Sequence, residues 1–509
     1  MMKNNRLYQV RNKSFSSILL MLFFAGTFTL AQEPIDIHIN SGDPAFPFPQ
    51  FQPYINPSAK LGNVGTRNNV GVPHAEMEKT IREAYRIMMN RAEKPGGEVG
   101  GIDYVYYRSD CNCAEGDGYG LLGAVAMADK QTFDGMWLYI HDHFIYKVRR
   151  YSDCQEVDPL YEYGQLPGNL HPRVDDAAAD ADVDIAFALL LAYRQWGEFM
   201  GINDGCGNPI SYKQAAIDFL AAMTDTFNFV RSNSTIITGD IGLDGYIKKG
   251  NTWGEMTDWA NDVSRSGFTR PPNFGGPNDI YFDYAAPSYF RAFADFLAEV
   301  DSAKYAWNIY QFRRAEASSD WLMGQLYNQD PSNIPFAGRA SIGPDNVPIF
   351  KKDGKKGEDM RLGWRTILNY MWHGNPANTW DPVTHQVVPG VPNSFERDMA
   401  LRYARFLWDN RQDPWNNPCV PGADKKFTYW GPHVLWTDWE INGTGGNFFF
   451  LNWIQATGSP SAVISQDYAL MGDMYRQLEI EWDVATPGDG YLTSVPFYFH
   501  GWFRLLGLL

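Results

Sequence analysis

The sequence predicts an all-α fold, an (α/α)6 barrel of six helical hairpins with long loops on one face. Apolar residues recur at helical spacing along most of the chain, whereas period-two strand patterns are sparse, with Ser234–Thr238 as the candidate. The links between helical windows alternate between short turns and long loops rich in Gly, Pro, Asn and Trp. Stacked helical hairpins that close into a ring account for all three observations.

The expected helices begin after an N-terminal arm. Residues 32–74 are rich in Pro, Asn and Gly and lack a sustained period, so we expect an extended or partly disordered arm. The first helical stripe consists of Met77, Ile81, Tyr85 and Met88. Further helical windows cover 118–129, 132–148, 184–198, 212–224, 287–299, 302–325, 362–373, 395–411, 445–457, 463–482 and 495–508. Thr132 and Ser302 are expected to be helix N-caps.

The domain organisation follows from the links between these windows. The long links cover 225–286, 326–361 and 374–394. No repeat at a fixed short period is visible, which disfavours an open solenoid. Because no linker-like break follows the arm, residues 75–509 are expected to form one catalytic domain.

The first 31 residues have the layout of a secretory signal peptide. Basic residues come first, an apolar run from Phe15 to Leu30 follows, and Thr29 and Ala31 supply small residues for cleavage before Gln32. An uncleaved anchor is the alternative, but the run is short and rich in Ser, Thr and Gly. No later stretch approaches the ~18 apolar residues of a membrane span. We therefore expect a secreted protein, periplasmic or extracellular.

Charge and composition narrow the choice of partners. The chain has 43 basic and 59 acidic residues, a net charge of −16, and no basic cluster follows the signal peptide. This balance argues against a nucleic-acid or anionic-membrane partner. Aromatic residues make up 15%, which suits a cleft where rings stack on sugars and carboxylates do the chemistry. We expect a polysaccharide or oligosaccharide substrate and a monomeric protein.

The five cysteines are too few for a disulfide scaffold in a chain of this length. Export permits one or two bridges and leaves at least one thiol over. Cys111-Asn-Cys113 could be half of a zinc site, but no second clustered pair accompanies it. Neither a metal nor another cofactor is expected.

Three acidic clusters stand at the starts of expected helices. The first places Glu115 in a Gly-rich approach to an apolar helix, where it either caps the helix or, if burial raises its pKa, acts as a general acid. The second places Asp180, Asp182 and Asp184 at a helix N-terminus. An EF-hand is excluded there because the sixth and twelfth positions lack the required Gly and Glu. One of these aspartates is expected to point into a cleft.

The third cluster contains Glu358 and Asp359, followed by Arg361. Glu358 and Arg361 are three residues apart, so they share one face of the expected helix. The guanidinium could hold the carboxylate ionised, as a general base requires. An ordinary surface ion pair is the alternative at this spacing.

The chain resembles glycoside hydrolase family 8 in four segments that occur in the family's order. The family's Ser-Glu-Gly-x-Gly-Tyr-Gly-Met signature is similar to Glu115-Gly-Asp-Gly-Tyr-Gly-Leu-Leu, and its Ala-Thr-Asp-Ala-Asp-x-Asp-Ile-Ala block is similar to Asp180-Ala-Asp-Val-Asp-Ile-Ala. Its Tyr-Phe-x-Pro-Ala-Tyr-Tyr-Arg segment resembles Tyr284-Ala-Ala-Pro-Ser-Tyr-Phe-Arg, and its Asp-x-x-Arg-x-x-Trp-Arg segment resembles Glu358-x-x-Arg-x-x-Trp-Arg. The resemblance spans about residues 75 to 509 and implies an (α/α)6 barrel that hydrolyses β-1,4-linked glycans with inversion.

Residue roles follow from the same resemblance. Glu115 takes the position of the general acid, and Asp180 that of the aspartate which contacts the distorted sugar. Tyr284 and Arg361 would hold the base and its water. The family usually has Asp at the base position, whereas this chain has Glu358, with Asp359 as runner-up. Glu358 is preferred because its spacing to Arg361 keeps the family's register.

An inverting mechanism places the acid and base carboxyl groups roughly 6.5–9.5 Å apart, with a water beside the base. Tyr119, Trp137 and Trp196 are candidate stacking platforms for sugar rings, with core packing as the alternative for each. Trp253, Trp259 and Trp372 are further candidates.

Other functions stay open at this point. A neutral β-1,4-glucan or xylan is the first choice of substrate, with a chitosanase or mixed-linkage glucanase of the same family as alternatives. From other classes, helical barrels also serve polysaccharide lyases and non-catalytic glycan-binding proteins. Carboxylates at both the acid and base positions favour hydrolysis, and the choice between endo and exo action is open.

Overall fold

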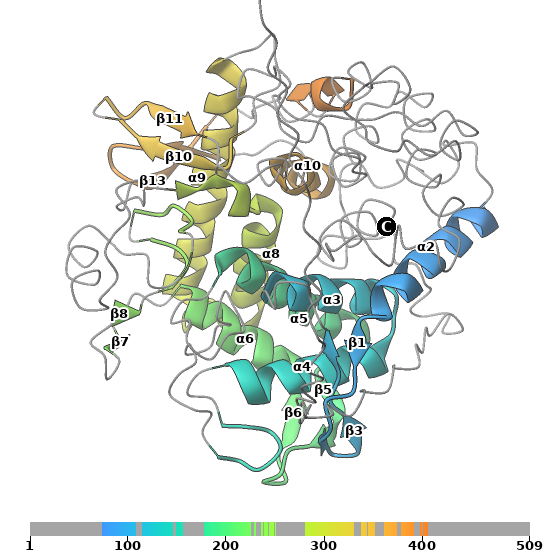
Figure 1. Cartoon of the computed structure of the whole chain (residues 1–509). Helices are drawn as coiled ribbons and strands as arrows, with labels where there is room; N and C mark the ends of the chain where they lie inside the picture. Colours follow the sequence, from blue (N-terminus) through green and yellow to red (C-terminus); the bar gives the residue numbers. More distant parts are fainter. Residues whose placement is uncertain are drawn as a thin grey trace, which may run out of the picture.

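The computed structural model describes residues 74–107, 114–145, 149–155, 178–224, 229–230, 236–237, 239–242, 244–248, 250, 280–329, 337–343, 345–351, 361–373, 378–390, 398–399 and 401–405. This part of the chain is mostly helical, as the sequence predicts (Figure 1). Its named α-helices are α2 (His74–Met89), α3 (Ala114–Ala126), α4 (Lys130–Phe144), α5 (Ala179–Trp196), α6 (Tyr212–Met223), α8 (Pro287–Asp301), α9 (Ala306–Gln329) and α10 (Arg361–His373). The predicted signal peptide and nearly all of the predicted arm lie outside the described residues, as do the helices expected after residue 405.

Helix α3 begins at Ala114, four residues before the predicted window, so Glu115 lies within its first turn and not in a flexible approach to it. The glycines that suggested flexibility serve close packing instead. A Cβ on Gly118 would lie 3.1 Å from the Asp184 Cβ, and one on Gly120 would lie 2.4 Å from the Met136 Cε. The helix therefore accepts the helix-weakening glycines because they let its neighbours approach.

Both predicted N-caps are wrong. Helix α4 begins two residues before Thr132, whose backbone N–H donates to the Asp129 side chain at 3.2 Å, so Asp129 is the cap. Ser302 follows the end of α8, where Asp301 Oδ1 accepts from the backbone N–H of Lys304 at 2.9 Å. In each case a nearby aspartate, with a longer reach and a charge, accepts the bond that the hydroxyl was expected to accept.

Short antiparallel strands join the helices, which the sequence did not predict beyond Ser234–Thr238. The strands are β1 (Ala92–Glu93), β2 (Glu98–Val99), β3 (Ile102–Asp103), β4 (Tyr106–Tyr107), β5 (Phe199–Asn203), β6 (Pro209–Ser211), β7 (Phe229–Val230), β8 (Ile236–Ile237), β9 (Ile280–Tyr281), β10 (Arg339–Ile342), β11 (Pro348–Lys351), β12 (Asn378–Asp381) and β13 (Gln386–Pro389). The candidate at Ser234–Thr238 is confirmed over β8, which pairs with β7. Strands of two to five residues are too short to show a period of two in the sequence.

One small sheet leads directly to the candidate site. Strand β10 pairs with both β9 and β11, and Arg339 lies opposite Tyr281. The 3-10 helix η1 (Phe282–Tyr284) follows β9 at once and is buried. The predicted loops 326–361 and 374–394 thus each contain a β-hairpin. The hairpin in the first loop pairs with β9 and so anchors η1.

Helix α5 lies at the centre of the described core (Figure 1). It packs against α3, α6 and α8, while α8 in turn packs against α9 and α10. The Phe187 ring on α5 stacks on Tyr289 of α8 at 3.7 Å and on Trp372 of α10 at 5.4 Å between ring centroids. This aromatic stack fixes α5, α8 and α10 relative to one another, and the charged residues described below lie at the first turns of α5 and α10.

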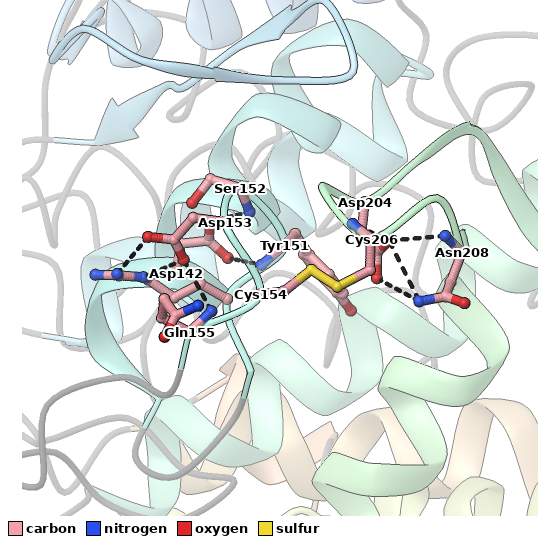
Figure 2. Close-up of a disulfide and its surroundings, with 10 residues drawn as sticks. Asp142, Tyr151, Ser152, Asp153, Cys154, Gln155, Asp204, Cys206 and Asn208 are labelled. Atoms are coloured by element: carbon pink, nitrogen blue, oxygen red, sulfur yellow. Dashed lines mark hydrogen bonds and ion pairs between the residues drawn. A yellow bond between two sulfur atoms is a disulfide. The ribbon is translucent and has the colours of Figure 1, made fainter.

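A disulfide ties two loops together away from this stack. Cys154 and Cys206 are bonded, with their Cα atoms 6.1 Å apart (Figure 2). The loops that carry the two cysteines are held by the side chains of Asp142 and Asp204, which accept hydrogen bonds from backbone N–H groups around the bridge. Cys111, Cys113 and Cys419 lie outside the described residues, and export of the chain stays a prediction. Within the described ranges, no helix is both long and apolar enough to span a membrane.

Candidate active site

The guanidinium of Arg361 joins three carboxyl groups. Its Nη1 donates to Glu115 Oε1 at 3.0 Å and to Asp180 Oδ2 at 2.6 Å, and its Nη2 donates to Asp283 Oδ2 at 2.7 Å. These carboxyl groups come from α3, α5 and η1, and Arg361 is the first residue of α10. We call Arg361, Glu115, Asp180 and Asp283 the Arg361 cluster.

Helix starts explain why these residue types gather here. Glu115 and Asp180 lie in the first turns of α3 and α5, where the positive end of a helix stabilises a carboxylate. Arg361 occupies the first position of α10, where the same field opposes a cation. The carboxyl groups around the guanidinium offset that cost, as a fully buried charge requires.

Exposure distinguishes Glu115 from the rest of the cluster. Its side chain is 16% exposed, whereas those of Arg361, Asp180 and Asp283 are 0% exposed. Among the carboxyl groups of the cluster, Glu115 is therefore the one that a molecule from outside can reach.

The protons of the cluster are shared unequally. Burial opposes ionisation of Asp180, but a hydrogen bond from Glu115 and the charges of Arg361 and Arg365 outweigh it, so the pKa of Asp180 lies below its ordinary value. Asp180 is thus ionised in the folded protein. A negative charge beside a second, partly exposed carboxyl group favours a proton on that second group, which general-acid chemistry requires.

A second buried ion pair supports the cluster. Arg365 Nη2 donates to Asp184 Oδ2 at 2.9 Å, and its Nη1 donates to the backbone carbonyl of Tyr284 at 3.2 Å. Burial raises the pKa of Asp184 to about 7, against the opposing charge of Arg365. Because Arg365 lies one turn after Arg361 on α10, the two arginines together bind α10 to α5 and η1.

Tyr284 and Tyr119 line the cluster as neutral phenols. The Tyr284 ring lies 4.9 Å from Arg361 Cζ, a cation–π contact. Burial, with nearby carboxylate charges, raises the pKa of both tyrosines well above the ordinary value. The structure therefore brings together five of the predicted site residues, which are Glu115, Tyr119, Asp180, Tyr284 and Arg361.

Of the predicted tryptophan platforms, Trp372 lies in the aromatic stack with Phe187 and Tyr289, and Trp137 and Trp196 lie away from the cluster. Trp137 is 1% exposed and packs edge-on against Phe219 in the core, so its ring offers no face to a sugar. Trp196 is the last residue of α5 and Asp180 the second, which at about 1.5 Å per residue places their backbones about 24 Å apart. Trp196 packs against Phe133, at 5.2 Å between ring centroids. Packing within the core is the role that both positions indicate.

The base position is not among the described residues. Glu358 and Asp359 both fall in the segment before α10, and Trp253 and Trp259 also lie outside the described ranges. The assignment of the base therefore stays a prediction, although Arg361, three residues after Glu358, is placed.

The sequence reasoning missed Asp283. Its carboxyl group belongs to no cluster of acids and opens no α-helix, which were the two signals used. A signal was nonetheless present, because Asp283 is a single charged residue inside the apolar run from Ile280 to Ala286. A lone carboxyl group in such a run must be paired or neutral when buried, which marks it as a site candidate.

One group of described residues has the spacing of a metal site. Cys154, Asp204 and Cys206 place their ligand atoms within 4.8 Å of one another. The two sulfur atoms are bonded to each other, so neither is a thiolate ligand. The group therefore does not fit a metal ion while the bridge is formed.

The chain is similar to known glycosidases in sequence. The family model for glycosyl hydrolases family 8 matches residues 107–221. A beta-glucanase from Niallia circulans is 25% identical over 343 residues, which cover 62% of this chain and 76% of the relative. Endoglucanase A from Acetivibrio thermocellus is 25% identical over 262 residues, which cover 52% of this chain and 42% of the relative. This chain thus spans less than half of that endoglucanase.

Solved structures share the fold. A beta-1,3-1,4-glucanase from Paenibacillus sp. X4 superposes with a TM-score of 0.55 at 16% identity, covering 86% of this chain and 92% of the other. A family 8 xylobiose complex from Teredinibacter turnerae superposes with a TM-score of 0.58 at 14% identity, covering 89% and 97%. The matched family model includes α3 and α5, which carry Glu115 and Asp180. The chain is a glycoside hydrolase, similar to family 8 in sequence over residues 107–221 and in fold over most of its length.

Proposed function

We propose that the protein is a secreted hydrolase that cleaves a β-1,4-linked polysaccharide, a neutral glucan or a xylan, with inversion at the anomeric carbon. The observation that carries this proposal is the Arg361 cluster, in which a partly exposed Glu115 and an ionised, buried Asp180 share one guanidinium. The names of the relatives, a beta-glucanase and an endoglucanase, support a glucan. The xylobiose bound to the Teredinibacter turnerae protein supports a xylan.

Glu115 is the general acid in this proposal. Its hydrogen bond to Asp180 keeps the proton on Glu115 until a glycosidic oxygen accepts it. As the proton leaves, the Arg361 Nη1 that contacts Glu115 Oε1 stabilises the new carboxylate. The donor and its counter-charge are in place before substrate binds, so little reorganisation is needed during bond cleavage.

Asp180 serves as the electrostatic partner of the sugar. Its carboxylate is ionised and completely buried, so its negative charge is poorly screened. A positive charge that develops on the ring at the point of cleavage is stabilised by such a fixed anion. Because the Asp180 side chain is 0% exposed, this effect acts through its charge, without the direct contact with the sugar that the resemblance implies.

Glu358 is the proposed base, with Asp359 as runner-up. Three residues of chain span at most about 11 Å, so the base stays within reach of Arg361. The inverting geometry requires its carboxyl group to lie about 6.5–9.5 Å from that of Glu115, with one water between the base and the sugar. The longer Glu side chain, compared with the family's usual Asp, fits a reaction that passes through this water.

The proposal includes a closed (α/α)6 barrel over residues 75–509. The packing of α3, α4, α5, α6, α8, α9 and α10 as neighbours supports it. Residues 1–31 are proposed to be a cleaved signal peptide. N-terminal sequencing of the exported protein tests this point, since a start at Gln32 is expected and a retained Met1 would contradict it.

A mixed-linkage glucanase is the second candidate, because the Paenibacillus protein is a beta-1,3-1,4-glucanase. A lyase is disfavoured by the tyrosines of the site. A lyase needs an easily ionised base, whereas burial holds the pKa of Tyr119 and Tyr284 well above the ordinary value.

The test is a polymer panel. The exported protein, Glu115→Gln and Glu358→Gln are incubated with carboxymethyl cellulose, lichenan, xylan and chitosan, and reducing ends are followed. We expect release from a glucan or xylan that both substitutions abolish, with the α-anomer appearing first by proton NMR. The β-anomer as first product would contradict inversion. Full activity of Glu358→Gln would move the base to Asp359, and release from none of the four polymers would overturn the proposed substrate.

A further inference from the structure

We propose that Asp283 is a positioning residue of this active site, which orients the Arg361 guanidinium and offsets its charge. The inference rests on the proposed function, since Glu115 and Asp180 are the groups that Arg361 holds. Asp283 itself does not touch the sugar, because its side chain is 0% exposed and contacts the far nitrogen of the guanidinium.

The geometry of the guanidinium requires a third partner. Glu115 and Asp180 both bind Nη1, so their two bonds converge on one nitrogen. A planar guanidinium held at one nitrogen can still tilt about that point. The bond from Nη2 to Asp283, at 2.7 Å, fixes the second corner and hence the plane of the group.

Asp283 is itself anchored in two directions. Its backbone N–H donates to the carbonyl of Gly338 at 3.1 Å. Strand β9, which immediately precedes η1, pairs with β10 through Tyr281 and Arg339. The next residue, Tyr284, has its carbonyl bound by Arg365. These contacts fix the backbone of Asp283, and with it the side from which its carboxyl group meets Arg361.

Charge gives Asp283 a second effect. Burial disfavours the charged form of Arg361, but Asp283, followed by Asp180 and Glu115, raises the pKa of the arginine well above its ordinary value. Among these neighbours Asp283 makes the largest contribution, and it contacts Nη2, not the Nη1 that Glu115 and Asp180 share. It neutralises part of the guanidinium charge from the far side, so less of that charge acts on the proton of Glu115.

Every ionisable group that faces Arg361 from the described elements enters this balance. They are Glu115 and Tyr119 on α3, Asp180 and Asp184 on α5, Asp283 and Tyr284 in η1, and Arg365 on α10. Without the Asp283 charge, the guanidinium lowers the pKa of the nearby acids further. The acid form of Glu115 is then lost at a lower pH.

The test compares Asp283→Asn with Asp134→Asn. Asp134 is a matched control, because it is a buried carboxyl group bonded to Lys130 and Tyr212 and, within the described part of the chain, makes no hydrogen bond or ion pair to the Arg361 cluster. For Asp283→Asn we expect kcat to fall at least about tenfold with KM changed less than about threefold, and the alkaline limb of the pH profile to move down by at least about half a unit. Asp134→Asn is expected to lower the melting temperature and leave the pH profile unchanged.

Asp283→Glu separates charge from geometry. It keeps the negative charge but moves the carboxyl group, so the alkaline limb is expected to return toward the wild-type position while kcat stays low. A crystal structure of Asp283→Ala, which removes the acceptor that Asn would keep, provides a readout that needs no activity, with the Arg361 guanidinium rotated away from its contact with Asp180.

Either of two results would overturn the inference. One is a pH profile for Asp283→Asn that matches the wild type, with a loss of kcat no larger than that of the control. The other is an unchanged Arg361 orientation in the crystal structure of Asp283→Ala. If the wild type cleaves none of the polymers, the proposed function fails, but the crystal structure still decides whether Asp283 positions Arg361.

Discussion

Two buried aspartates of this protein differ in their partners. Asp142 accepts hydrogen bonds from the backbone N–H groups of Tyr151 and Ser152, at 2.6 and 2.9 Å, and from the hydroxyl of Tyr104 at 2.7 Å. Asp180 instead binds the charged guanidinium of Arg361 and the carboxyl group of Glu115, which can take up or release a proton. The donors around Asp142 are mostly fixed groups of the fold, whereas those around Asp180 are ionisable side chains from other helices.

This difference separates a structural carboxylate from a reactive one. The bonds to Asp142 hold the loop at residues 149–155 beside the Cys154–Cys206 bridge (Figure 2). The bonds to Asp180 instead determine where a proton resides. Both aspartates have a lowered pKa, so the direction of the shift alone does not distinguish them. The identity of the hydrogen-bond donors does.

The largest effect is expected from Arg361→Met, which removes the group common to the whole cluster. Three buried or part-buried carboxyl groups then lose their counter-charge, and breaking a buried ion pair in this way costs about 3–5 kcal/mol. We expect the free energy of unfolding to fall by about that amount and glycan hydrolysis to be abolished. Urea unfolding measures the first and reducing-end release the second. Retained activity would contradict the central role of this arginine.

Glu115→Gln is expected to affect activity without a similar loss of stability. Gln keeps the size and one acceptor but cannot donate a proton to the glycosidic oxygen, so kcat should fall about 10²- to 10⁴-fold. Because the side chain is 16% exposed, we expect the free energy of unfolding to change by less than about 1 kcal/mol. A large stability loss with little loss of kcat would place Glu115 with the structural carboxylates.

Asp142→Asn is expected to lower stability with little loss of activity. Burial opposes ionisation of Asp142, but hydrogen bonds from His141, Tyr104 and Ser152 outweigh it and lower the pKa to about 2. With an unfolded-state pKa of about 3.9, the ionised form contributes about 2–3 kcal/mol above pH 4 and loses it as the pH falls toward 2.

We therefore expect this variant to be less stable than the wild type at pH 7, with the difference shrinking between pH 4 and pH 2. Denaturant unfolding across this pH range is the measurement. Activity at pH 7 below the unfolding temperature should stay within about twofold of the wild type. A loss of kcat comparable to that of Glu115→Gln would remove the distinction between the two aspartates.

The sequence could predict helices more completely than the site. Windows of helical spacing located α5, yet its predicted start at residue 184 was late because Asp180 and Asp182 interrupt the apolar pattern. Those same aspartates, placed at a helix start, revealed the site. The contact between Asp283 and Arg361 spans 78 residues and depends on how β9 pairs with β10, which no local pattern encodes.

The tryptophan platforms show the opposite case, in which helix geometry by itself contradicts the prediction for Trp196. The predicted helix contained Trp196 at its C-terminal end and the aspartate cluster at its N-terminal end. The rise of about 1.5 Å per residue already placed them more than 20 Å apart. Aromatic content indicated a sugar cleft, but helix geometry would have excluded this particular ring from the catalytic end.

Asp117 gives the smallest predicted effect and a third environment for a buried carboxyl group. It is 1% exposed, its Oδ2 has no hydrogen-bond partner among the described residues, and burial raises its pKa well above the ordinary value. The folded protein therefore keeps this proton above pH 4, where the unfolded chain releases it, so the contribution of Asp117 to stability is lost as the pH rises. Asp117→Asn removes this dependence. We expect its unfolding free energy, relative to the wild type, to increase by about 1 kcal/mol or more between pH 4 and pH 7, measured by urea unfolding at both values. A difference that does not change with pH would mean that Asp117 is ionised in the folded protein and has a charged partner, as Asp180 does.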